Sequence, residues 1–279
     1  MRSVFIRHNC SSTPDVLRQL WERRLIALHY DDNFSTNPTD YYPAGRKALE
    51  RLWGYCKGGA IVGADYRRLD GSKMLVGFLE QGAQIFSEEF HDPSSGDSFI
   101  YKVAALSNAV EVPYANYPLL VGIQPRQATL TGWPSAKGAL LAAVKGRSLP
   151  RKPNSLHPSQ LEVLCYEWLR SSGKLERLVL PIGRGLMDID IFGIGRGEKR
   201  VIGQVTYSKN AADLSDKQSR LLGHARDTDS VYFFLPEDAP LVAGDGVELV
   251  TFRKVLDDLQ ADPDVSTKAM LREMFAEYR

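Results

Sequence analysis

The chain has 279 residues, enough for one large domain or two ordinary ones. Hydrophobic residues make up 43% and charged residues 25% of it, an ordinary profile with ample material for a core. A net charge of +1 excludes an overall basic signature for nucleic acid, so any phosphate binding must come from local patches.

The cysteines and the apolar runs exclude further classes. Cys10, Cys56 and Cys165 lie far apart, without a CxxC pair, which argues against a disulfide framework and a cysteine-based zinc site. No run of roughly 18 apolar residues is present, and the first residues lack the apolar centre of a secretory signal. We therefore expect a cytoplasmic protein with reduced thiols and no membrane segment.

The N-terminal half is predicted to be rich in short strands. Helices are expected from Pro14 onward and over 45–56, and β-rich runs then follow at 60–66, 73–79, 83–86 and 100–106. Short runs separated by turns are typical of a small, strongly bent sheet or barrel. Glycines inside them, Gly63 and Gly77, fit bulges or sharp bends. This half resembles the PUA-like class, including EVE domains, and the resemblance implies recognition of a base, such as a modified base flipped from the stack.

Polar side chains alternate with apolar anchors in the stretch 118–134. Its candidates for nucleic-acid contact are Gln124, Arg126, Gln127 and Trp133, because donors beside an aromatic ring suit phosphates and bases. The alternative is an ordered connecting loop with a buried tryptophan. A basic, proline-bearing stretch at 146–154 follows and is interpreted as a linker, which gives domains at 1–148 and 154–279.

Two strands joined by a tight turn are predicted within 181–209. Asp188 and Asp190 alternate with apolar residues in the first strand, so the two side chains should share one face. Carboxylates on a buried strand are unfavourable unless they are paired, hydrogen-bonded or holding a cation. Oxygen ligands suit Mg²⁺ or Mn²⁺ rather than zinc. Upstream, an amphipathic helix is predicted over 155–170, with Glu162 in its first turn.

An early helical Glu, a strand Asp, a turn and a strand Gln follow one another in this half. This order resembles the PD-(D/E)XK nuclease superfamily, and Gln204 in place of the usual acid resembles the Mrr-type restriction enzymes. The resemblance covers about 156–236. It implies that Glu162, Asp190 and Gln204 bind or orient Mg²⁺ or Mn²⁺, with Asp188 as an alternative or helper to Asp190.

The resemblance also exposes a departure from the family. The family places a lysine that supports the attacking water two residues after the Glu or Gln, and this chain has Thr206 there. Lys209 is close along the chain, but its odd offset from Gln204 points it to the other face of a regular strand. Thr206 and Lys209 are thus the candidates for orienting the water. Downstream, Lys217 and Arg220 line one side of a predicted helix and form a candidate phosphate track, or simply a solvated helix face.

Each candidate also has a plain structural explanation. Glu162 could close a capping box with Ser159. Asp188 could pair with Arg184 or Arg200, and Gln204 could be a satisfied core amide.

The expected fold class is α/β (α+β): a restriction-endonuclease-like mixed sheet flanked by helices, preceded by a small β-barrel-like domain with helices. The expected function is metal-dependent endonucleolytic cleavage of DNA, in the restriction of foreign or modified DNA. The alternatives are a catalytically silent nucleic-acid-binding protein and a nuclease directed at RNA. Cutting both strands would favour a homodimer.

Overall fold

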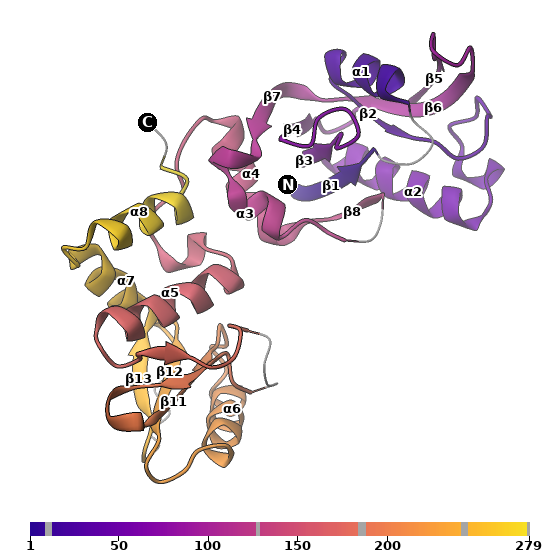
Figure 1. The fold of residues 1–279 in the computed structure, drawn as a ribbon. Coiled ribbons are helices and arrows are strands. Elements are labelled where there is room, and N and C mark those ends of the chain that lie inside the picture. Colours follow the sequence, from indigo (N-terminus) through magenta and orange to yellow (C-terminus); the bar gives the residue numbers. More distant parts are fainter. Residues whose placement is uncertain (9–12, 127–128, 184–187, 241–244, 278–279) are drawn as a thin grey trace. The chain divides into compact units, whose positions relative to one another are not determined.

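The computed structural model describes residues 1–8, 13–126, 129–183, 188–240 and 245–277 (Figure 1). The chain divides into two compact units, one formed by Met1–Leu149 with Ala276–Arg279 and the other by Pro150–Phe275. Within the described ranges, no helix has the length and apolar character needed to cross a membrane.

The first unit combines two sheets with short helices. Its elements are β1 (Arg2–Arg7), α1 (Pro14–Glu22), β2 (Leu25–Leu28), α2 (Pro43–Gly58), β3 (Ala60–Asp65), β4 (Lys73–Leu79), β5 (Phe86–His91), β6 (Ser98–Ala105), β7 (Ser107–Pro113), α3 (Pro118–Gly122), β8 (Leu130–Gly132) and α4 (Lys137–Val144). One sheet has the order β7-β4-β3-β1-β8, in which only β1 and β3 run parallel. The other is the antiparallel sheet β2-β6-β5.

The barrel expected in this half is not formed by the described strands. The two edges of the five-stranded sheet, β7 and β8, do not pair with each other, so the sheet stays open. One physical reason is the length of β8, whose three residues pair only with β1.

The two glycines singled out in this sheet have different roles. The register of β4 against β7 shifts between Val76 and Phe78, so Gly77 lies at the expected irregularity. A Cβ at Gly63 would lie 2.9 Å from the ring of Trp133. Glycine at this position therefore makes room for a core side chain.

The second unit has the mixed α/β architecture that the sequence predicts. Its elements are α5 (Pro158–Ser171), β9 (Arg177–Leu178), β10 (Ile191–Ile194), β11 (Arg200–Val205), α6 (Ala211–Gly223), β12 (Ser230–Leu235), β13 (Glu248–Thr251), α7 (Phe252–Ala261) and α8 (Val265–Met274). The sheet order is β13-β12-β11-β10-β9. Strands β11, β12 and β13 are parallel, and β9, β10 and β11 are antiparallel.

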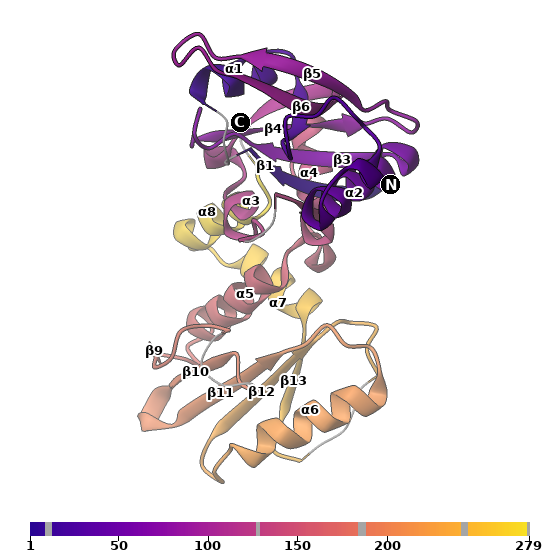
Figure 2. The ribbon, with the colours of Figure 1, turned by 90° about the vertical axis from the view of Figure 1, so that its right-hand side faces the viewer.

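Helices cover both faces of this sheet (Figure 2). Alternation along β12 separates the layers: Phe233 packs with Leu214 of α6, whereas the rings of Tyr232 and Phe234 lie 6.4 and 6.0 Å from that of Trp168 on α5. The end of β11 and the start of β10 thus lie between an α5 layer and an α6 layer.

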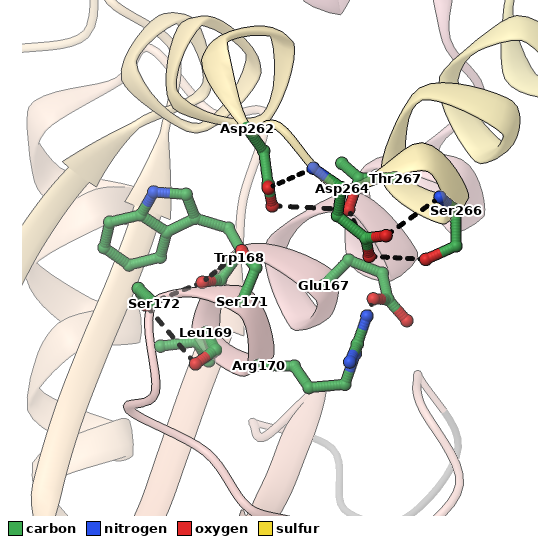
Figure 3. A network of polar contacts seen from close by, with 10 residues as sticks. All are labelled: Glu167, Trp168, Leu169, Arg170, Ser171, Ser172, Asp262, Asp264, Ser266 and Thr267. Carbon is green, nitrogen blue, oxygen red and sulfur yellow. Dashed lines mark hydrogen bonds and ion pairs between the residues drawn. The ribbon is translucent and has the colours of Figure 1, made fainter.

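Carboxylates fix the turn between α7 and α8 (Figure 3). The Asp264 side chain accepts a hydrogen bond from the Ser266 N–H (3.1 Å), and Asp262 accepts one from the Asp264 N–H (2.9 Å). An Asp at the N-cap satisfies a backbone donor that the helix cannot, so α8 begins at Val265.

Candidate active site

Asp190 lies where the pairing of β10 with β11 ends. Its N–H donates to the Gly203 carbonyl (2.9 Å), and its Oδ2 accepts from the Val205 N–H (2.8 Å). The Asp190 carboxylate thus takes the backbone N–H of Val205, just beyond the last residue pair of β10 and β11. Burial raises the pKa of Asp190, while the Val205 N–H and the positive charge of Lys217 act to lower it.

Glu162 approaches this point from α5. Burial and the negative charge of Asp190 raise the pKa of Glu162 to about 6. Both carboxyls therefore favour their protonated forms more than exposed acids do. A half-buried carboxyl whose pKa is raised by burial and by a neighbouring carboxylate marks a place where a cation is favourable.

Gly183 allows Glu162 its position. A Cβ on residue 183 would lie 2.2 Å from Glu162 Oε2, and the backbone there has a φ of +68°. The left-handed backbone favours glycine, and a side chain at this position would displace the Glu162 carboxylate. The Gly183 N–H also donates to the Asp190 carbonyl (2.9 Å), so this turn contacts both acidic residues.

The capping explanation for Glu162 is wrong. The N-cap of α5 is His157, whose ring accepts from the Ser159 N–H, and Gln160 supplies the reciprocal bond to the His157 N–H. Ser159 therefore lies inside the helix. Glu162 makes no hydrogen bond or ion pair to any residue in the described ranges, so its carboxylate is available for a ligand.

Lys217 brings a positive charge to Thr206. Thr206 is buried, and its Oγ1 accepts a hydrogen bond from Lys217 Nζ (3.1 Å). Lys217 also pairs with Asp213 one turn earlier on α6 (3.2 Å). From the sequence, Lys217 is a candidate member of a phosphate track or of a solvated helix face. Only the tertiary structure shows that Lys217, eleven residues after Thr206 and on α6, places its ammonium group against Thr206.

Gln204 lies in β11, two residues before Thr206. Its Cα lies opposite that of Phe233, and Ile202, two residues earlier, packs with Phe233 under α6. The Gln204 side chain is buried, and its Oε1 has no hydrogen-bond partner in the described part of the chain. The role of Gln204 in orienting a cation stays a prediction.

Asp188 is separate from Asp190. Its carboxylate lies 3.5 Å from Arg220 Nε and 3.8 Å from His224 Nε2, both at the end of α6. Arg220 also pairs with Asp216 (3.0 Å), so its charge is shared between two acids. Asp188 and Arg220 therefore form an ion-pair cluster, whereas the Asp190 carboxylate accepts from the Val205 N–H. The backbone bends at Asp190, directly before β10 begins.

Lys209 is also directed elsewhere. Its Nζ lies 2.6 Å from Asp238 in an exposed ion pair. Thr206 and Lys209 are the two residues expected to orient a water. Thr206 contacts Lys217, whose charge acts on Asp190, whereas Lys209 pairs with Asp238 at the surface.

The candidates in the first unit have other environments. Trp133 is a core residue, 2% exposed, whose indole N–H donates to the Ile123 carbonyl (2.9 Å), which contradicts a surface contact and supports the buried-tryptophan alternative. The Gln124 amide accepts from Arg67 (2.8 Å) and donates to the Tyr114 hydroxyl (2.9 Å). Arg126 is exposed. Gln127 lies outside the described residues.

No protein-family model, curated protein or solved structure matches this chain. The candidate site therefore depends on its own geometry.

The donor set fits a hard divalent cation. The described residues contain no group of three or more His, Cys, Asp or Glu that could hold a metal. Two carboxylates nevertheless suit Mg²⁺, which usually keeps several waters and binds through one or two carboxylates and substrate phosphates. Glu162 and Asp190 are the residues that would hold it.

Proposed function

We propose that the unit Pro150–Phe275 is a nuclease domain of the restriction-endonuclease-like class that hydrolyses phosphodiester bonds of DNA with Mg²⁺ or Mn²⁺. The observation that carries the proposal is the meeting of Glu162 and Asp190 beside Lys217. The pKa of Glu162 is raised to about 6 by burial and by the charge of Asp190. A cation between two such carboxylates offsets their repulsion, and an ammonium group nearby adds a site for phosphate.

Each residue has a defined part in this proposal. The bound cation would lower the pKa of a water and offset the charge that develops on the phosphate. Asp190, fixed by the Val205 N–H, gives the site a rigid ligand, and Glu162 gives it a second. Lys217, held by Thr206 Oγ1, would orient the water and bind a phosphate oxygen. It would thereby take the role of the lysine that the nuclease family has at the position of Thr206.

The second candidate is a catalytically silent nucleic-acid-binding protein with the same fold. It is favoured by the lack of a group of three or more His, Cys, Asp or Glu ligands among the described residues. An RNA-directed nuclease is a variant of the first candidate, since Glu162, Asp190 and Lys217 would serve the cleavage of either nucleic acid.

For the first unit we propose a role in holding the nucleic acid. Three of its aromatic side chains are well exposed: Phe34, Tyr42 and Trp53 at 60%, 79% and 40%. The Trp53 indole donates to the Thr36 carbonyl (3.0 Å), so its ring lies against the segment that contains Phe34. Exposed rings can stack on unpaired bases.

The proposal is tested with the purified full chain and labelled single-stranded DNA, duplex DNA and RNA of one sequence, each with Mg²⁺, with Mn²⁺ and with a chelator. A nuclease cuts at least one DNA substrate in a metal-dependent way. Binding of these substrates without any cleavage would identify the silent protein instead. Cleavage of RNA alone would keep the chemistry and change the substrate.

A further inference from the structure

The second unit contains a cavity of about 320 Å³ near the carboxylates. Small-molecule sites usually have volumes of about 300–1,000 Å³ and combine apolar walls with a few polar groups. The residues that line it are Lys152, Pro153, Asn154, Leu161, Tyr207, Lys209, Pro236, Glu237, Asp238, Phe252 and Arg253.

The cavity adjoins the candidate active site through two of its walls. Leu161 directly precedes Glu162 on α5, and Tyr207 directly follows Thr206 at the end of β11. Burial raises the pKa of Tyr207, and the charges of Cys165, Glu162 and Asp190 add to this effect, which is consistent with the place of Tyr207 directly after Thr206. A ligand in the cavity would therefore lie next to the carboxylates.

One wall of the cavity is aromatic. The rings of Tyr207 and Phe252 lie 5.5 Å apart at an angle of 44°. Tyr207 is 40% exposed, whereas Phe252 is buried, so Tyr207 is the ring with a free face. Prolines and Leu161 add further apolar surface. A flat aromatic ligand matches such a wall, because stacking needs little beyond an accessible ring face.

The rim of the cavity is polar and carries both charges. Lys209 pairs with Asp238 (2.6 Å), and Arg253 pairs with Glu237 (3.6 Å). Both pairs are exposed, and exposed ion pairs contribute little, so either cation can exchange its carboxylate for a phosphate. Lys152 makes no ion pair with any residue the structure describes. Cations beside an aromatic wall fit a nucleotide, with its base inside and its phosphate at the rim.

We propose that this cavity holds the base of a nucleotide adjacent to the cleaved phosphodiester, stacked on Tyr207, with a phosphate bound by Lys209 and Lys152. The inference rests on the proposed nuclease function and narrows its substrate. A base can enter only when it leaves the helical stack. The substrate is therefore DNA that is single-stranded, mismatched or otherwise unpaired at the cut site.

Nucleotide binding tests this inference separately from cleavage. Isothermal titration without metal, on the full chain carrying Asp190→Asn, compares deoxyadenosine monophosphate with deoxyribose 5-phosphate. The nucleotide should bind, and the baseless sugar phosphate should bind at least tenfold more weakly. Tyr207→Leu should weaken nucleotide binding about 5- to 100-fold, while Tyr207→Phe, which keeps the ring, should change it less than threefold.

A second pair of variants makes the test independent of the folding of Tyr207→Leu. Lys209→Ala removes an exposed rim cation and should weaken nucleotide binding severalfold, whereas Lys268→Ala, on α8, should not change it. Equal binding of nucleotide and sugar phosphate, or equal binding by wild type and both cavity variants, overturns the inference. Metal-dependent DNA cleavage that persists with no nucleotide binding overturns the cavity site alone, and nucleotide binding without cleavage overturns the nuclease proposal.

Discussion

Replacement of Lys217 by methionine tests whether this side chain supplies the cation that Thr206 cannot. Lys217→Met keeps the length of the side chain and removes the ammonium that donates to Thr206 Oγ1 over 3.1 Å. It also removes the positive charge that lowers the pKa of Asp190. The loss of one charged group that stabilises a transition state lowers kcat by about 10²- to 10³-fold. The Lys217 side chain is 27% exposed, so we expect the lower end, near 10²-fold.

The assay is single-turnover cleavage of the best DNA substrate with saturating Mg²⁺. Lys254→Met is the matched control, because Lys254 pairs with an aspartate four residues away, as Lys217 does, but lies on α7. The double variant Thr206→Lys with Lys217→Thr returns the ammonium to the strand and should recover at least a tenth of the wild-type rate. Cleavage by Lys217→Met at the wild-type rate would refute the reasoning.

Three further predictions concern Glu162, Gly183 and Trp133. The pKa of Glu162 is about 6 in the folded chain, raised from the 4.5 of an ordinary glutamate. The contribution of its protonated form to stability is therefore complete below pH 4.5 and is lost as pH rises through 6. Urea unfolding in chelator should show Glu162→Gln more stable than wild type at pH 8, by less than about 1 kcal/mol after allowance for solvent screening, and not at pH 4.5. A constant difference across that range would contradict the assignment. Gly183→Ala should lower the cleavage rate at least tenfold, because its Cβ would meet the Glu162 carboxylate. Gly197→Ala is the control, since Gly197 has a similar φ of +67° but open space around it, so this variant should have a similar backbone strain and a normal cleavage rate. Equal cleavage rates of the two variants would exclude the contact between residue 183 and Glu162. Trp133→Ala should destabilise the first unit by about 3–5 kcal/mol in urea unfolding, and a smaller loss than that of Trp53→Ala would show that Trp133 is not a core residue.

Local pattern identified much of the second unit. Glu162 in an early helical turn and Asp190 before a strand are positions that spacing can predict, and the charge of Asp190 contributes, after burial, to raising the pKa of Glu162. The mixed sheet between helices follows from the alternation of strand-like and helix-like runs.

Contacts between segments that are distant in the sequence could not be predicted from local sequence patterns. Asp188 and Asp190 look equivalent in the sequence, but a bend before β10 sends the former to Arg220 and the latter to the Val205 N–H. Lys217 resembles any solvated helical lysine until α6 packs on the sheet. In the first unit, short strands predicted a barrel, although closure depends on the pairing of the edge strands, which no local pattern specifies.

The central claim is that one acidic pair, Glu162 and Asp190, performs metal-dependent cleavage, and the two neighbouring aspartates test it most directly. The measurement is the Mg²⁺-dependent cleavage rate of wild type, Asp190→Asn and Asp188→Asn under identical conditions, with circular dichroism to show that each is folded. We predict a loss of at least 10²-fold for Asp190→Asn and a change of less than threefold for Asp188→Asn, whose carboxylate pairs with Arg220 and His224. Full cleavage by Asp190→Asn, or an equal loss in both variants, would contradict the claim.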